Sequence, residues 1–363
     1  MRILITGNMG YVGPGVVAQL RRTYPEAHLV GLDHGWFAHC LTSRAVLPEI
    51  LLDEQRFGDV RKVTRQDLEG FDAVVHLAAV SNDPMGNRFA TVTDAINHRA
   101  SVHLARVAAA AGVKRFVFAS SCSIYGFAAD GQPRTEKDPV APLTAYARSK
   151  IATEEGLAGL NGDLEITCLR FATACGFSPR LRLDLVLNDF VAGALTSGEI
   201  SVLSDGTPWR PLIHVRDMAR AIDWALQRGA TAGDRFLTVN AGSQRWNYQV
   251  RELAEAVGRV LPGVKVSVNP NAPPDKRSYK VDFSLFERLA PDHQPQETLE
   301  GSVAELIEGL RSIGFADPDY RQSHLIRLKV LEGLMESGAL TEDLTPRHVA
   351  QRRTNHEVQS LAS

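Results

Sequence analysis

The stretch LITGNMGYVGPG, residues 4–15, decides the expected fold. The stretch follows an apolar run and precedes a helical pattern. Its glycines Gly7, Gly10 and Gly13 are three residues apart. Such glycines permit a tight turn and a close approach of backbone to a diphosphate, and the helix N-terminus adds amide donors. A purely structural turn is the simpler alternative, but the strand–turn–helix context favours a dinucleotide site. The residues predicted to contact the cofactor are Gly7, Gly10, Tyr11, Val12 and Gly13.

The predicted second strand ends in an acid, Asp33, about 20 residues past the last glycine of this loop. An acid at this position accepts the adenosine ribose hydroxyls and repels a 2′-phosphate. No arginine follows immediately, so the sequence predicts NAD rather than NADP as the cofactor. A simple turn residue is the alternative for Asp33. Asp59 and Val60, in GDVR (58–61), are weaker candidates for an adenine pocket.

Short β-branched or aromatic runs alternate with longer helical patterns through the first half of the chain. The runs lack polar–apolar alternation, which is typical of parallel strands covered on both faces. We therefore predict an α/β fold, a Rossmann-type doubly wound parallel sheet with a smaller C-terminal substrate-binding domain. The predicted strands cover residues 2–6, 29–32, 73–77, 115–120 and 165–170, with 235–240 as a segment that could return to the sheet. The predicted helices cover residues 94–112, 184–197, 215–228, 247–260 and 300–313.

The alternation of strand-like and helical patterns becomes irregular after residue 176, which suggests a domain boundary. We assign residues 1–176, with returning segments at about 210–242, to the NAD-binding domain. Residues 177–209 and 243–340 form the predicted substrate-binding domain. Residues 341–363 are polar and weakly periodic, which indicates an arm or a partly disordered tail. The stretch 34–57 is long and apolar for a connection.

Bulk properties restrict the class of protein. The chain has 363 residues and a formal net charge of −2, which gives no sign of nucleic-acid binding or attraction to an anionic membrane. No apolar stretch approaches the length of a membrane span, and the N-terminus lacks a signal-peptide pattern. Four cysteines without a Cys-x-x-Cys pair indicate free thiols in a reducing cytoplasm. The histidines form no metal-spaced cluster, so no metal is expected.

Two groups of residues suggest proton-transfer chemistry. LTAYARSK (143–150) places Tyr146 and Lys150 four residues apart, on one face of a predicted helix that Thr144 could cap. A lysine ammonium beside a phenol favours the phenolate and lowers the pKa of the tyrosine. FASSCSIYG (118–126) places hydroxyl groups at the end of a predicted strand. Each group alone also has a simpler interpretation. Tyr146 and Lys150 could lie on a solvated helix face, and the serines could merely form a turn.

In combination, these motifs resemble the extended short-chain dehydrogenase/reductase family, in particular its NAD-dependent nucleotide-sugar epimerase/dehydratase branch. The resemblance covers about residues 1–315. It also rests on HLAA (76–79), AINHRAS (95–101), AGVKRFVFASS (111–121) and RPLIHVRDMARA (210–221). It implies a homodimer that pairs through the helices at about 94–111 and 144–160.

The resemblance also implies roles for single residues. Tyr146 would be the general acid/base, Lys150 its partner, and Ser121 the donor to the reacting sugar oxygen. Ser123 would face the sugar secondarily and Ser120 would pack at the strand end. Leu77, Ala78 and Asn97 would line the cofactor; ordinary core packing and helix capping are the alternatives.

On the substrate side, the resemblance implies that Arg210 and Arg277 clamp the diphosphate of a nucleotide-sugar, which the planar guanidinium suits. Asn188 matches a family asparagine near the phosphates and sugar. Ser81 lies in a polar loop, Ser81-Asn82-Asp83, that could contact the sugar. Arg180 and Arg182 are weaker candidates, and surface positions are the alternative for every arginine.

The expected reaction is epimerisation of a nucleotide-diphosphate sugar through a transient keto-sugar. The family's 4,6-dehydratases carry an Asp-Glu pair after the active hydroxyl residue, whereas Cys122 and Ser123 stand at those positions here. A 4,6-dehydratase is therefore less favoured. The main alternative to an epimerase is a nucleotide-sugar ketoreductase or dehydrogenase. A non-enzymatic NAD(P)-binding regulator and a reductase of a small non-nucleotide substrate stay open as other classes.

Overall fold

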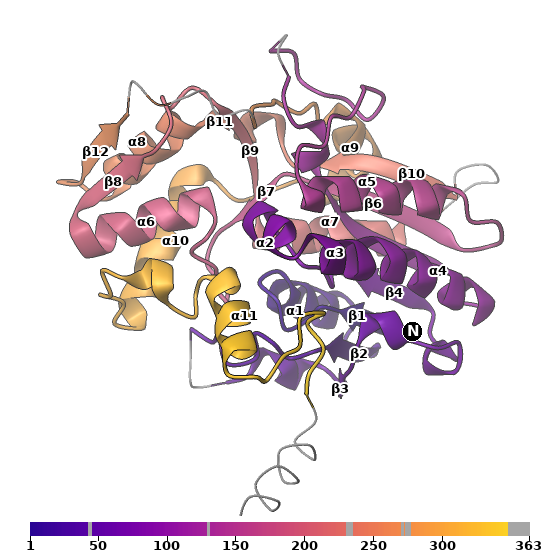
Figure 1. The fold of residues 1–363 in the computed structure, drawn as a ribbon. Coiled ribbons are helices and arrows are strands. Elements are labelled where there is room, and N and C mark those ends of the chain that lie inside the picture. Colours follow the sequence, from indigo (N-terminus) through magenta and orange to yellow (C-terminus); the bar gives the residue numbers. More distant parts are fainter. Residues whose placement is uncertain (43–45, 129–130, 230–234, 270–271, 273–276, 348–363) are drawn as a thin grey trace, which may run out of the picture.

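A seven-stranded sheet lies at the centre of the fold (Figure 1). The computed structural model describes residues 1–42, 46–128, 131–229, 235–269, 272 and 277–347. All neighbouring strands of the large sheet are parallel, which confirms the predicted doubly wound architecture. The order across the sheet is β10 (Phe236–Ala241), β6 (Glu165–Phe171), β5 (Arg115–Ser121), β4 (Ala73–His76), β1 (Arg2–Thr6), β2 (His28–Asp33) and β3 (Glu54–Phe57).

Both faces of this sheet are covered by helices. In β1, Ile3 and Ile5 belong to one hydrophobic cluster, with α1 (Gly13–Thr23) and α7 (Val215–Gln227). Leu4, which points to the other face, belongs to a second cluster with α4 (Ala100–Ala110) and α5 (Ala145–Ala158). Because side chains alternate between the faces of a strand, burial on both sides explains the continuous apolar runs of the sequence.

The remaining elements lie mainly beside the large sheet (Figure 1). A three-stranded sheet has the order β11 (Asn247–Gln249), β9 (Trp209–His214) and β7 (Thr173–Cys175), and a two-stranded sheet pairs β12 (Lys265–Val268) with β8 (Glu199–Val202). The other helices are α2 (Asp83–Arg88), α3 (Ala90–Thr93), α6 (Val186–Ser197), α8 (Val250–Val260), α9 (Ser284–Leu289), α10 (Leu299–Ser312) and α11 (Arg327–Glu336). The division into two domains stays a prediction, but its returning segment is visible, because β10 joins the large sheet beside β6.

Two parts of the chain differ from the sequence-based expectation. The stretch 34–57 is not only a connection, because it ends in β3, the edge strand that pairs with β2. The expected tail begins as ordered chain: Leu344 is fully buried and Arg61 donates to the carbonyl oxygen of Asp343 at 2.9 Å. Residues 348–363 of that tail lie outside the described residues.

Candidate active site

A cavity of about 860 Å³ opens at the carboxyl ends of β1, β2, β4 and β5. Ligands of open α/β sheets bind in this position. The cavity reaches from the glycine loop to the elements beside the large sheet. Its walls bring together most of the residues predicted from the sequence: Gly7, Gly10, Tyr11, Val12, Gly13, Asp33, Asp59, Val60, Leu77, Ala78, Ser81, Ser121, Ser123, Tyr146, Lys150, Arg210 and Arg277.

The glycine loop has the geometry of a diphosphate cradle. Gly7 has a φ of +74°, and a Cβ atom there would lie 2.6 Å from the backbone nitrogen of Ala78. At Gly13 a Cβ atom would lie 2.1 Å from the carbonyl oxygen of Asn8. Side chains are therefore excluded at both places. The N-terminus of α1 follows directly, so its free amide groups face the end of the cavity where a dinucleotide diphosphate fits.

Asp33 lies at the end of β2, on the wall of the cavity. Its two carboxylate oxygens accept hydrogen bonds from the backbone amides of Met9, at 3.1 Å, and Gly35, at 2.8 Å. Burial raises the pKa of Asp33, while these two amides act in the opposite direction. The contact with Met9 ties the end of β2 to the glycine loop, and the carboxylate is placed to accept further hydrogen bonds from ribose hydroxyls.

We expect Asp33→Ala to lower the affinity for NAD by about tenfold or more, because hydrogen bonds to a charged group are worth about 1.5–3 kcal/mol. The same change removes the charge that repels a 2′-phosphate, so the preference for NAD over NADP should fall. Titration calorimetry with both dinucleotides measures the ratio, and thermal unfolding without added dinucleotide controls for the loss of the loop contacts. An unchanged ratio of the two affinities would contradict the assignment.

Tyr146 and Lys150 project from α5 towards the end of β5. The side chain of Thr144 accepts from the amide of Ala147 at 3.1 Å and so caps this helix, as the sequence predicts. The Lys150 ammonium donates to the carbonyl oxygen of Ala119 at 2.7 Å and lies 5.5 Å from the centre of the Tyr146 ring.

Burial, more than the neighbouring lysine, governs the protonation of this pair. Burial raises the pKa of Tyr146 to about 12, although a hydrogen bond with Ser121 acts to lower it. Burial also lowers the pKa of Lys150 to about 7, against the opposing effect of Glu154. The sequence-based expectation of a lowered tyrosine pKa therefore fails for the protein alone, because desolvation disfavours both charged forms.

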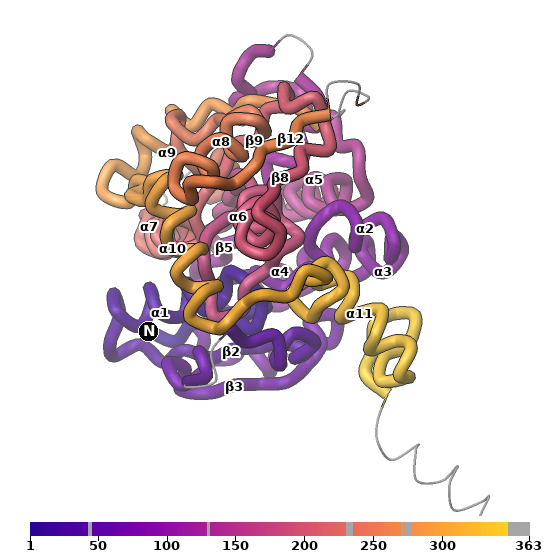
Figure 2. Tube along the Cα trace, turned by 90° about the vertical axis from the view of Figure 1, so that its left-hand side faces the viewer, coloured from indigo at the N-terminus to yellow at the C-terminus, as the bar shows by residue number. Residues whose placement is uncertain are grey.

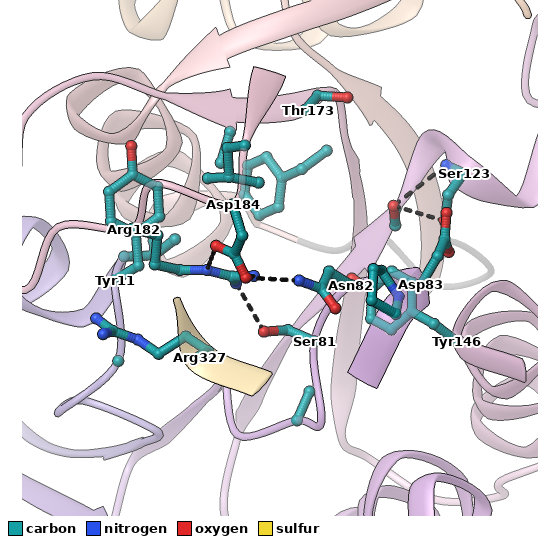
Figure 3. Close-up of a pocket in the computed structure, with 18 of the residues that line it drawn as sticks. Tyr11, Ser81, Asn82, Asp83, Ser123, Tyr146, Thr173, Arg182, Asp184 and Arg327 are labelled. Carbon is teal, nitrogen blue, oxygen red and sulfur yellow. Dashed lines mark hydrogen bonds and ion pairs between the residues drawn. The ribbon is translucent and has the colours of Figure 1, made fainter. Parts of the chain in front are cut away.

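The three serines at the end of β5 have different surroundings. Ser121 donates to the hydroxyl of Ser123 at 2.9 Å, lines the cavity and also forms a hydrogen bond with Tyr146. Ser123 lines the same cavity, on the side that holds Tyr146 (Figure 3). Ser120 instead donates to the buried carboxylate of Glu154, in line with a packing role. Cys122 is fully buried and its thiol donates to the carbonyl oxygen of Arg170 at 3.0 Å.

A polar network crosses the middle of the cavity (Figure 3). Arg182 makes a bidentate pair with Asp184, at 2.8 and 3.0 Å, and donates to the Ser81 hydroxyl at 2.9 Å. The amide of Asn82 donates to the same carboxylate at 2.8 Å. Sequence reasoning overlooked Asp184 and gave Arg182 little weight. The signal was the charged RLRLD segment (180–184) directly before a helix.

The two predicted diphosphate-binding arginines also line the cavity. Arg277 donates to the carboxylate of Asp83 at 3.2 Å, and Asp83 in turn accepts from the hydroxyl of Thr144 at 2.7 Å. Arg210 donates to the carbonyl oxygen of Trp209 at 2.9 Å. The chain thus brings two cations from distant segments to the wall that also holds Tyr146.

Asn97 and Asn188 lie behind the cavity wall and do not line it. The Asn97 amide exchanges hydrogen bonds with the backbone of Val80, at 2.8 and 2.9 Å. The Asn188 amide donates to the Tyr11 hydroxyl at 3.0 Å and accepts from the Gly176 amide at 3.1 Å. Both side chains are buried and hydrogen-bonded to backbone or to a wall residue, which fits a positioning role. Their predicted contacts with ligands stay predictions.

Within the described ranges, no three His, Cys, Asp or Glu side chains are gathered in a way that could hold a metal ion. Among the helices that the structure describes, none combines the length and the apolar character needed to cross a membrane.

Comparisons with known proteins agree with this geometry. The model of the NAD dependent epimerase/dehydratase family matches residues 3–242. UDP-arabinose 4-epimerase 1 of Arabidopsis thaliana is 25% identical over 292 residues, which are 74% of this chain and 68% of that protein. UDP-glucose 4-epimerase of Mycolicibacterium smegmatis is 27% identical over 331 residues, 86% of this chain and 99% of that protein. The crystal structure of DesIV, a dTDP-glucose 4,6-dehydratase from Streptomyces venezuelae with NAD bound, has a TM-score of 0.73 at 27% identity and covers 88% of this chain and 99% of its own.

Proposed function

Because this chain belongs to the NAD-dependent epimerase/dehydratase family, we propose that it epimerises a nucleotide-diphosphate sugar through a transient keto-sugar. The observation that carries the proposal is the convergence of Ser121, Tyr146 and Lys150 on one cavity with the glycine loop. The relatives named above include two UDP-sugar 4-epimerases, which makes a UDP-sugar the first substrate to test.

The proposed chemistry divides between the cofactor and the side chains. Bound NAD would supply the acceptor and the donor of the hydride that is exchanged with a sugar carbon. Burial keeps Tyr146 a phenol in the protein alone, and a phenol cannot accept a proton, so Tyr146 would act in its phenolate form. The phenolate oxygen would take the proton of the sugar hydroxyl as the keto-sugar forms, and would give it back when the keto-sugar is reduced on its other face. The Ser121 hydroxyl donates to the same sugar oxygen. The Lys150 ammonium, close to the Tyr146 ring, favours the phenolate once the proton has left.

The surroundings of Cys122 support epimerisation over 4,6-dehydration. Eliminating water needs an added acid and base beside the sugar, and Cys122 occupies one of the two positions where a dehydratase carries carboxylates. Its thiol points into the core, and burial raises its pKa well above the usual range. Of the carboxylates that line the cavity, Asp83 is engaged by Arg277 and Asp184 by Arg182.

Turnover without any added oxidant or reductant is the expected signature of an epimerase. The purified protein is incubated with UDP-glucose, UDP-arabinose and other nucleotide-sugars, and the products are separated by chromatography and identified by NMR. Absorbance at the NADH band is followed in the same samples. A product epimer without net NADH supports the proposal. Stoichiometric NADH would identify a dehydrogenase, a 4-keto-6-deoxy product a dehydratase, and tight binding without any product a regulator.

A further inference from the structure

A segment that the family model does not match closes one side of the cofactor cavity. We call residues 320–347 the C-terminal strap; it contains α11, which lies beside α2 (Figure 2). Leu331, Leu340 and Leu344 of the strap are buried in the same cluster as the core residues of β1 and β2. The strap ends against Arg61, which donates to the hydroxyl of Thr345 at 3.0 Å. It is therefore a packed part of the fold.

The first residue of α11 is a buried cation with unusual partners. Arg327 is 1% exposed, and its guanidinium donates to the carbonyl oxygens of Arg180 and Leu181, at 2.8 and 3.1 Å, and of His324, at 3.1 Å. It also lies over the ring of Phe37, at 4.9 Å from the centroid. In the described part of the chain no carboxylate forms an ion pair with it.

Two neighbouring arginines differ from Arg327 because each of them pairs with a carboxylate. Arg180 pairs with Glu49 at 2.6 Å and Arg182 pairs with Asp184 at 2.8 Å. Within the described residues, Arg327 hydrogen-bonds to carbonyl oxygens, and the carboxylate that acts on its charge, Asp184, is already paired with Arg182. Burial lowers the pKa of Arg327 to about 10, so the group still carries its charge at neutral pH. A buried charge is costly unless an opposite charge meets it. We therefore expect the charge of Arg327 to be compensated by a bound anion.

The position of Arg327 on the cavity wall indicates where an anion would bind. Arg327 lines the same cavity as the glycine loop and Asp33. Arg327 and Tyr11, a residue of that loop, both contact the short segment 178–181, and Figure 3 places Arg327 far from Ser123 and Tyr146. The diphosphate of a dinucleotide sits at such a loop, whereas the diphosphate of a nucleotide-sugar is expected at Arg210 and Arg277.

We propose that the C-terminal strap is part of the cofactor site and that Arg327 supplies the cation that meets the diphosphate of the dinucleotide. The proposal needs NAD binding, but it does not depend on which reaction the protein catalyses. It assigns a binding role to α11.

The test compares ligands that differ in their phosphates, using the full-length protein. We expect Arg327→Gln to weaken NAD and ADP-ribose by about tenfold or more, since hydrogen bonds to charged groups are the strong ones. Adenosine, which lacks the diphosphate, should change by less than about twofold on the same reasoning. Binding of UDP should be unchanged. Calorimetry measures NAD, ADP-ribose and UDP, and ligand-observed NMR measures adenosine.

Control variants separate binding from folding. Lys329→Ala, on the same helix, removes a half-buried pair with Glu332 and should leave all four affinities unchanged. Arg327→Lys keeps the charge but loses the forked geometry, and should give an intermediate loss for NAD; it replaces the glutamine variant if that variant does not fold. Equal losses for adenosine and ADP-ribose would show a merely structural role, and a loss for UDP alone would assign the cation to the substrate. Either result, or no change in NAD affinity, overturns the proposal.

Discussion

Replacing Tyr146 by phenylalanine is expected to lower kcat by about a hundredfold to ten-thousandfold, the usual contribution of a positioned general acid/base. The change removes only the hydroxyl that we propose exchanges a proton with the sugar. The ring stays, so its packing against the Lys150 ammonium at 5.5 Å is kept. Steady-state rates with the nucleotide-sugar that the wild-type protein turns over give the measurement.

Affinity for NAD provides the internal control for this variant. The glycine loop and Asp33 lie on other elements, so NAD should bind Tyr146→Phe as it binds the wild-type protein. Full activity of the variant would remove the acid/base role from Tyr146. A parallel loss of NAD binding and activity would show instead that the hydroxyl holds the cofactor.

The second large effect concerns stability. Glu154 is 5% exposed and accepts hydrogen bonds from Arg170, with a shortest distance of 2.7 Å. Arg170 also donates to the hydroxyl of Tyr125 at 3.0 Å, and that hydroxyl donates to Asn240 at 2.7 Å. Glu154→Ala leaves the Arg170 charge buried without its partner. We expect the free energy of unfolding to fall by about 3–5 kcal/mol, measured by urea denaturation.

The adjacent residue gives a matched control for this substitution. Glu155 lies on the same turn of α5 but is exposed, so Glu155→Ala should change stability by less than about 0.5 kcal/mol. The double variant Glu154→Leu, Arg170→Met removes both charges and should recover much of the loss. A Glu154→Ala protein as stable as the wild type would mean that water or another group compensates Arg170.

Local pattern was enough to predict most of the large sheet. Strands such as Ala73–His76 are buried on both faces and carry continuous apolar runs, which the sequence displays directly. The edge strand Glu54–Phe57 escaped prediction, because its EQRF sequence is polar and its burial is partial. For α11 the signal was present: Leu328, Leu331 and Leu334 recur at helical spacing, within a stretch assigned only as part of a larger domain.

In the candidate site, too, the local features could be predicted from the sequence and the long-range contacts could not. Tyr146 and Lys150 could be predicted because four-residue spacing on a helix is a local property, and the family resemblance gave them roles. The pairing of Arg182 with Asp184 and Asn82, and the burial of Arg327 against Phe37, depend on segments far apart in the sequence. The raised pKa of Tyr146 could not be predicted either, because desolvation depends on the surrounding fold.

The C-terminal strap touches both sides of the cavity, and this bears on how the protein relates to the redox state of a cell. Its beginning is held by α6, where the hydroxyl of Tyr320 donates to Asp189 at 2.7 Å, and its end is held by Arg61, which pairs with Asp59 on the cavity wall. If the dinucleotide is held against this strap through Arg327, as proposed above, we expect its exchange with free NAD and NADH to be slow compared with turnover. The dinucleotide would then serve as a resident prosthetic group, and the rate would be insulated from the ratio of NADH to NAD outside the protein.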